Sequence, residues 1–180
     1  MTAVEPIRDK KDIKRIEDVL IKESYRNLLL FDLGINLGLR ISDILALNVY
    51  DVKDKNVIKL KEKKTGKYKT IPINIKIKKM LFDYTKDMEL NTPLFVSAYN
   101  NRLDRFTAYR IINNACKKAN IELAVGTHTL RKTFGYHFYK KYNDIVLLQK
   151  IFNHSNPAIT LRYIGIEQDY IYDSYKNFIL

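Results

Sequence analysis

The sequence is poor in the residues that mark secreted, disordered or membrane proteins. One cysteine, Cys116, stands among 180 residues, which excludes an internal disulfide and suits a reducing compartment. Six glycines and four prolines are too few for long disordered segments. The chain has no signal-like apolar start and no run of about 18 apolar residues. We therefore expect a cytoplasmic protein with no membrane segment.

Acidic residues are also scarce. The chain carries 20 of them against 32 lysines and arginines, for a net charge of +12. An excess of this size favours a polyanionic partner, with nucleic acid first. Hydrophobic residues make up 46% of the chain, which is enough for one globular core.

Helical periodicity dominates the pattern of apolar residues. A short change to β-like runs surrounds the glycine of "KEKKTGKYK", which predicts a hairpin rich in lysine. The fold class is therefore expected to be mainly α with a small antiparallel β-sheet (α+β). The expected helices lie at 11–23, 25–39, 42–52 with Ser42 as N-cap, 75–88, 106–119, 128–141, 144–153, 157–162 and 167–178, with the hairpin at 57–73.

Four stretches carry polar groups that an ordinary core does not need. Arg40, in "GLRISDILAL", follows a nearly apolar helix and must have a partner, because an unpaired buried charge is costly. A structural salt bridge with Asp43 is one reading of it. The lysine-rich hairpin can equally be a solvated turn or a phosphate contact. His128 and Arg131 share the first turn of a helix, whose N–H groups attract anions. His154 and Tyr163 flank a turn at Asn156-Pro157.

Taken together and in order, these groups resemble the catalytic domain of the tyrosine recombinases, the phage-integrase-like family. "GLRISDILAL" is similar to the family's first arginine box, and "HTLRKTFG" is similar to its His-x-x-Arg box. "FNHSNPAITLRYIGI" resembles the final box, with Phe152-Asn153 in place of the common Leu-Gly. Lys132 stands where a histidine is frequent in the family.

The resemblance implies DNA strand exchange through a 3′-phosphotyrosyl intermediate, of the kind used by mobile elements. Arg40 and Arg131 would clamp the nonbridging phosphate oxygens, and Tyr163 would be the nucleophile. His128 would take the tyrosine proton or bind the phosphate, and His154 would bind a nonbridging oxygen. Lys64, chosen over Lys61 and Lys67 by analogy with the family's Lys-Thr-Gly hairpin, would protonate the leaving 5′-oxygen.

Because cationic side chains do this work, neither a metal nor another cofactor is expected. The expected partners are double-stranded DNA and other protomers of the same chain in a DNA-bound assembly, which would place a bacterial or phage protein at the nucleoid. One face of the last helix is too apolar to be left in water; it is formed by Tyr170, Ile171, Ser174, Tyr175 and Phe178. The resemblance implies that this helix docks into a neighbouring protomer, because family members often dock a C-terminal segment in that way. Folding back onto the chain's own core is the alternative.

We expect one catalytic domain over 1–180, with a core at about 10–165 and a helical tail at about 166–180. We expect no counterpart in this chain of the N-terminal DNA-binding domain usual in the family, which makes the chain either a catalytic fragment or a naturally short relative. Two other functions remain open: a type IB topoisomerase-like DNA relaxase, and a DNA-binding relative that has lost catalysis.

Overall fold

The computed structural model describes residues 4–126 and 128–179, so positions 1–3, 127 and 180 of the expected domain lie outside the described residues. Helices dominate, and the one sheet described is a two-stranded antiparallel hairpin, which confirms the predicted fold class. The elements are α1 (Lys10–Glu23), α2 (Tyr25–Leu37), α3 (Ile41–Ile44), the 3₁₀ turn η1 (Val49–Asp51), β1 (Val57–Lys61), β2 (Tyr68–Pro72), α4 (Ile75–Thr85), α5 (Arg105–Lys118), α6 (Thr129–Tyr142), α7 (Ile145–Phe152), α8 (Pro157–Ile164) and α9 (Ile166–Asn177).

Helix α2 is the centre of the molecule. It is nearly apolar and packs against α1, α4 and α6. Gly34 allows α6 to approach closely, because a Cβ added there would lie 2.5 Å from the side chain of Leu130. Gly38 then ends α2 in a left-handed conformation with φ 61°, which glycine adopts without strain. Although α2 is apolar, no helix in the described part of the chain is long and apolar enough to cross a membrane.

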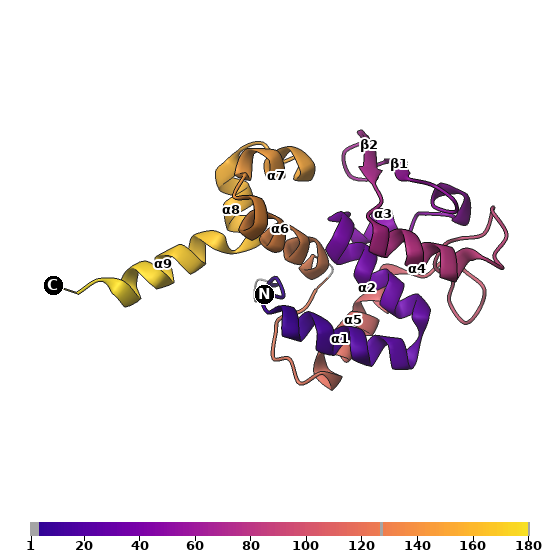
Figure 1. Ribbon diagram of the computed structural model, residues 1–180, viewed down its shortest axis with the longest axis horizontal. Helices are drawn as coiled ribbons and strands as arrows, with labels where there is room; N and C mark the ends of the chain where they lie inside the picture. The colour runs from indigo at the N-terminus through magenta and orange to yellow at the C-terminus, as the bar shows by residue number, and fades with distance from the viewer. Residues whose placement is uncertain (1–3, 127, 180) are drawn as a thin grey trace.

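Three apolar clusters form the core. One joins α2, α3 and α4 to the hairpin, and a second joins α1, α2, α5 and the start of α6. The third lies among α6, α7 and α8, around the fully buried Leu148 and Phe152. In Figure 1 the hairpin and α1–α5 occupy the right side, while α6–α8 lie to the left of α2. The end of α2 and the start of α6 meet between these two groups.

The hairpin pairs Val57 with Pro72 and Lys61 with Tyr68. The turn between them, residues 62–67, holds Gly66 at φ 68°. Ile58 on β1 is fully buried against the first cluster, whereas Tyr68 is 83% exposed. The predicted hairpin is therefore confirmed, with its turn directed away from the core.

The helix predicted at 42–52 is wrong. Helix α3 lasts one turn, with Arg40 rather than Ser42 at its N-cap position. The chain then becomes extended at Asn48, which forms a β-bridge with Pro93, before η1 begins. The backbone carbonyls account for the break: those of Leu45 and Leu47 accept hydrogen bonds from the guanidinium of Arg102, and that of Leu47 also accepts one from the N–H of Leu94, so neither serves a further turn of helix. Tertiary packing has overridden the local helical pattern.

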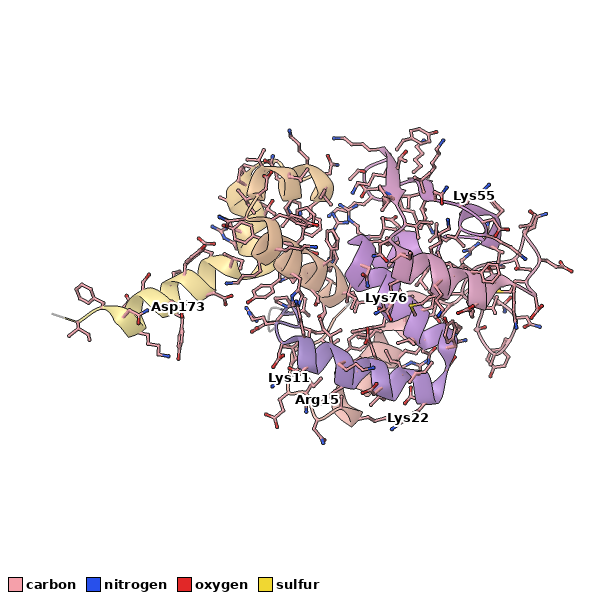
Figure 2. All side chains as sticks on the ribbon, in the orientation of Figure 1. Lys11, Arg15, Lys22, Lys55, Lys76 and Asp173 are labelled. Atoms are coloured by element: carbon pink, nitrogen blue, oxygen red, sulfur yellow. The ribbon has the colours of Figure 1, made fainter. Side chains whose placement is uncertain are left out.

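Helix α9 leaves the body of the molecule. Figure 1 shows it extending away from the other helices to the C-terminus, and Figure 2 labels Asp173 on this projecting segment. Ile166 is buried at its base, and Asp169 lies 3.3 Å from the guanidinium of Arg8. Beyond that point Tyr175 and Phe178 are 82% and 70% exposed. The tail therefore does not fold back onto the core of its own chain.

Candidate active site

The structure brings the predicted residues from five elements to one place. Arg40 lies between α2 and α3, Lys64 in the hairpin turn, His128 at the N-cap of α6 and Arg131 in its first turn. His154 follows α7, and Tyr163 lies in α8. The charges of Lys64, Arg40 and Arg131 all act on both His128 and His154, which places the six groups around one site.

The hydroxyl of Tyr163 meets an imidazole. His128 Nδ1 lies 3.1 Å from the Tyr163 oxygen, and the two rings are perpendicular with centroids 6.1 Å apart. The tyrosine ring also packs edge-on against Phe152 at 5.5 Å. These contacts fix the ring while leaving the hydroxyl within reach of a proton acceptor.

His154 lies on another side of the same tyrosine. Its ring centroid is 5.1 Å from that of Tyr163, and its Nδ1 is 3.0 Å from the hydroxyl oxygen of the buried Thr160. The single Thr160 hydroxyl proton has two acceptors in reach, His154 Nδ1 at 3.0 Å and the Asn156 carbonyl at 3.5 Å. The shorter contact favours donation to Nδ1, which leaves the ring proton on Nε2. The histidine can then donate a hydrogen bond to an anion.

Arg131 is 2% exposed and is held from two directions. Nη1 donates to the carbonyl of Gly38 at 2.7 Å, and Nη2 donates to the carbonyl of Phe152 at 2.9 Å. The guanidinium also lies over the Phe152 ring, 4.4 Å from its centroid. The end of α2 and the end of α7 thus orient one cation without neutralising it.

Arg40 is held by carboxylates, and the nearer of them is not the one the sequence suggested. Nη1 lies 2.9 Å from Glu62 Oε1 but 4.0 Å from Asp43 Oδ2. Although Nη1 is close to Glu62, its N–H bonds do not point at that oxygen, and no acceptor among the described residues takes them. Arg40 is therefore oriented by the charge of Glu62 rather than by an aligned hydrogen bond to it.

The pKa values of the two histidines favour their neutral forms. Burial, followed by the charges of Arg131 and Arg40, lowers the pKa of His154 to about 4. Burial and the neighbouring cations Arg131, Lys132 and Lys64 also lower the pKa of His128. A neutral His128 can accept a proton, which an imidazolium cannot.

The tyrosine is protonated in this arrangement. Burial raises the pKa of Tyr163, and the positive charges of Arg131 and Arg40 only partly oppose that effect. Arginine charge alone therefore does not produce a tyrosinate. The hydroxyl needs a base during reaction, and His128 is the base in contact with it.

Lys132 follows Arg131 on α6 and lies beside Tyr163. Its Nζ donates to the carbonyl of Val4 at 2.8 Å and lies 5.2 Å from the centroid of the Tyr163 ring. It thus connects the N-terminal segment to the Tyr163 ring, at a distance that permits a cation–π interaction.

Sequence reasoning missed Glu62, Lys69 and Thr160. Each acts through a tertiary contact: Glu62 beside Arg40, Lys69 beside Glu62, and Thr160 beside His154. Glu62 alone had a visible signal, because it is the one acid within a lysine-rich turn. In the described part of the chain no three His, Cys, Asp or Glu side chains gather as they would around a metal ion.

Comparison with known proteins identifies the family of this arrangement. Residues 8–169 match the model of the phage integrase family. The chain is 46% identical to the probable integrase/recombinase YoeC of Bacillus subtilis, over 99% of this chain and 98% of that protein.

Solved structures share the fold. The XerA recombinase aligns with a TM-score of 0.77 at 23% identity, over 98% of this chain and 68% of that one. A lambda integrase tetramer bound to a Holliday junction aligns with a TM-score of 0.71 at 17% identity, over 91% of this chain and 49% of that one. The chain spans 54% of the length of the tyrosine recombinase XerC of Thermodesulfovibrio yellowstonii and 61% of that of the XerD of Oceanobacillus iheyensis.

Proposed function

The chain belongs to the phage integrase family, and from that premise we propose that its site cleaves and rejoins DNA strands as a site-specific tyrosine recombinase. The observation that carries the proposal is the contact between the Tyr163 hydroxyl and His128, beside the two arginines. A nucleophile, a neutral base and cations for the phosphate are the groups that transesterification of a phosphodiester requires.

In the first step the Tyr163 oxygen attacks the scissile phosphorus while its proton passes to His128 Nδ1. Negative charge grows on the nonbridging oxygens, where Arg40 and Arg131 each offer a planar pair of donors. His154 Nε2–H adds a neutral donor. Because both arginines are held in place before substrate binds, little reorganisation accompanies the step.

The bond from phosphorus to the 5′-oxygen then breaks, and Lys64 gives that oxygen a proton. The products are a 3′-phosphotyrosyl ester and a free 5′-hydroxyl. Attack by a 5′-hydroxyl, from the same or another strand, reverses the chemistry and returns the tyrosine. One phosphoester bond replaces another, so rejoining the strand needs no nucleoside triphosphate.

The two other functions that the sequence left open are not favoured. Relatives of the chain are named integrases and recombinases, not relaxases. A DNA-binding relative without catalysis would have no need for Tyr163 and His128 to remain in hydrogen-bonding contact.

Self-association on DNA belongs to the same proposal. The lambda integrase neighbour is a tetramer on a Holliday junction, and the net charge of +12 suits a DNA surface. Helix α9 projects from the body with exposed Tyr172, Tyr175 and Phe178. Apolar side chains placed this way favour docking into a second copy of the chain. Action on chromosomal DNA would place the protein in the cytoplasm, at the nucleoid.

A nicked suicide substrate tests the proposal. In such a duplex the short strand beyond the cleavage point diffuses away, so the phosphotyrosyl ester accumulates instead of reversing. The expected result is a covalent protein–DNA adduct on a cognate site, formed in the presence of a metal chelator. A protein that binds this DNA tightly but never forms the adduct contradicts the proposal and favours a binding protein.

A further inference from the structure

Glu62 is an acid buried within the most basic turn of the chain. Its side chain is 0% exposed, although the flanking Lys61, Lys63 and Lys64 are all exposed. Removing a carboxylate from water costs several kcal/mol unless charges and hydrogen bonds compensate it. A glutamate in this position therefore needs a reason beyond hairpin formation, which a solvated turn achieves without it.

Glu62 contacts two cations with one oxygen, at ion-pair distance and without an aligned hydrogen bond, and a hydroxyl with the other. Oε1 lies 2.9 Å from Arg40 Nη1 and 2.9 Å from Lys69 Nζ. Oε2 accepts a hydrogen bond of 2.7 Å from the hydroxyl of Thr65. One carboxylate therefore connects a phosphate-clamping arginine to the residue that follows Lys64.

The turn that carries Lys64 is fastened on both sides of that lysine. The backbone N–H of Glu62 donates to the Lys67 carbonyl at 2.9 Å, and the N–H of Gly66 donates to the Glu62 carbonyl at 2.8 Å. On the other side, the N–H of Lys63 donates to Asp43 Oδ1 at 3.0 Å. The backbone of Lys64 thus lies between Asp43, which belongs to α3, and the Glu62–Thr65 pair.

The same carboxylate also links the hairpin to α7. Lys69, its second cationic neighbour, donates to the Ile151 carbonyl at 2.6 Å. Lys67 donates to the side chain of Asn153, the residue before His154, at 2.9 Å. The hairpin is therefore set against three parts of the site at once: Arg40, the end of α7 and the loop of His154.

We propose that Glu62 is a positioning residue that fixes the Arg40 guanidinium relative to the turn that carries Lys64. Arg40, which binds the phosphate, and Lys64, the general acid, then act on the same phosphate. This role rests on the proposed recombinase chemistry and adds a residue to it. Glu62 itself touches neither phosphate nor nucleophile. It acts through Arg40 by its charge and through Lys64 by Thr65.

The charge of Glu62 is constant over the working range of the site. Burial raises the pKa of this carboxyl, but the Thr65 hydroxyl and the charges of Lys69 and Arg40 outweigh burial and bring the pKa to about 2. The carboxylate therefore stays ionised while the histidines titrate. Without it, Arg40 and Lys69 would face each other with like charge and no counter-ion between them.

Two substitutions separate the contact of Glu62 with Arg40 from its contact with the Lys64 turn through Thr65. Glu62→Gln removes the charge that holds Arg40 and nearly preserves shape. Thr65→Val removes the hydroxyl that ties the Lys64 turn to Glu62 but leaves both ion pairs. Asp32→Asn is the matched control, because Asp32 is also a fully buried carboxylate paired with a lysine, Lys76, which Figure 2 labels on α4.

The measurement is the single-turnover rate of adduct formation per folded molecule, on ordinary DNA and on a strand with sulfur as the 5′-bridging atom. Thiolate leaves without a general acid, so the sulfur strand reports the site with Lys64 bypassed. On ordinary DNA we expect both Glu62→Gln and Thr65→Val to lose about 10–100-fold, the range seen for outer-shell partners at metal centres. On the sulfur strand Thr65→Val should return to near the wild-type rate, and Glu62→Gln should recover only in part.

A merely structural role gives another pattern. Glu62→Gln would then lower the melting temperature, as is expected of Asp32→Asn, and leave the rate per folded molecule unchanged on both substrates. That result overturns the proposal, as does a Thr65→Val deficit that the sulfur strand fails to relieve. A wild-type protein that forms no adduct on either strand instead refutes the recombinase function itself, so the two failures are distinguishable.

Discussion

His128 Nδ1 and the Tyr163 hydroxyl oxygen lie 3.1 Å apart, although α6, α7 and part of α8 separate the two residues along the chain. The contact depends on the packing of α8 against α6. Gly135 permits that packing, because a Cβ there would lie 2.6 Å from Ile164. Placement of Tyr163 thus depends on the third apolar cluster, and the proposed chemistry can be tested residue by residue.

Tyr163→Phe should bind DNA with wild-type affinity and form no covalent adduct. The ring would still pack against Phe152 and His154, while the attacking oxygen is gone. Gel shift measures binding, and mass spectrometry of the wild-type adduct locates the DNA. Tyr172→Phe, on the exposed face of α9, is the control and should react normally. Adduct on Tyr170 or Tyr172 in the wild type would contradict the assignment.

Arg40→Lys and Arg131→Lys should each slow cleavage by about a hundredfold or more, as the loss of one preorganised oxyanion donor does. Lysine keeps the charge but loses the planar pair of donors. Arg162→Lys changes the same residue type on α8, where the side chain is 78% exposed, and should be neutral. Rates are compared per folded molecule. A destabilised Arg40→Lys with normal activity would mean that Arg40 serves only an ion pair.

Lys64→Ala should be slow on ordinary DNA and nearly as fast as wild type on the 5′-bridging sulfur strand. The substitution removes the proton donor, which only an oxygen leaving group needs. Lys61→Ala, another exposed lysine of the hairpin, is the matched control. Slow reaction on both strands would reduce Lys64 to a phosphate contact, and a relieved deficit in Lys61→Ala would move the role there.

His154 should make the fold less stable in mild acid. Its pKa falls from 6.5 to about 4 in the folded chain, so the unfolded chain binds more protons between those values. The free energy of unfolding contributed by this group is therefore highest above pH 6.5 and decreases as the pH falls toward about 4. Urea titrations compare wild type with His154→Gln, whose stability should depend less on pH across that window. Equal pH dependence in both proteins would show that His154 stays accessible to protons.

Truncation after Asp169 should leave a folded protein that binds one DNA site but no longer assembles on paired sites. The cut keeps the buried Ile166 and the contact of Asp169 with Arg8, and it removes the exposed Tyr175 and Phe178. Thermal melting checks the fold, while light scattering on DNA with one or two sites follows assembly. Normal assembly by the truncated chain would refute docking of α9 into a second copy.

Much of the site could be predicted from the sequence because its reactive groups sit in short local patterns. His128 and Arg131 share one turn, and Pro157 starts the helix of Tyr163. What could not be predicted depends on contacts between distant elements. Asp43 was the nearer partner of Arg40 along the chain, but the hairpin brings Glu62 closer in space.

The helices show the same limit. Long amphipathic segments such as α1 and α5 were predicted to within a residue, because their caps and apolar stripes are local. The segment after Arg40 was not, since the carbonyls of Leu45 and Leu47 accept hydrogen bonds from the distant Arg102 instead of from a following turn of helix.

The orientation of Arg131 depends on two separate parts of the fold. Its guanidinium donates to one carbonyl at the end of α2 and to another at the end of α7. The end of α2 packs in the first apolar cluster, whereas the end of α7 packs in the third. A copy in which either group of helices has come loose loses one of those carbonyl contacts, so its Arg131 is no longer held in one orientation. Under the proposed function, such a copy would still bind DNA through its net positive charge but would not cleave the bound strand.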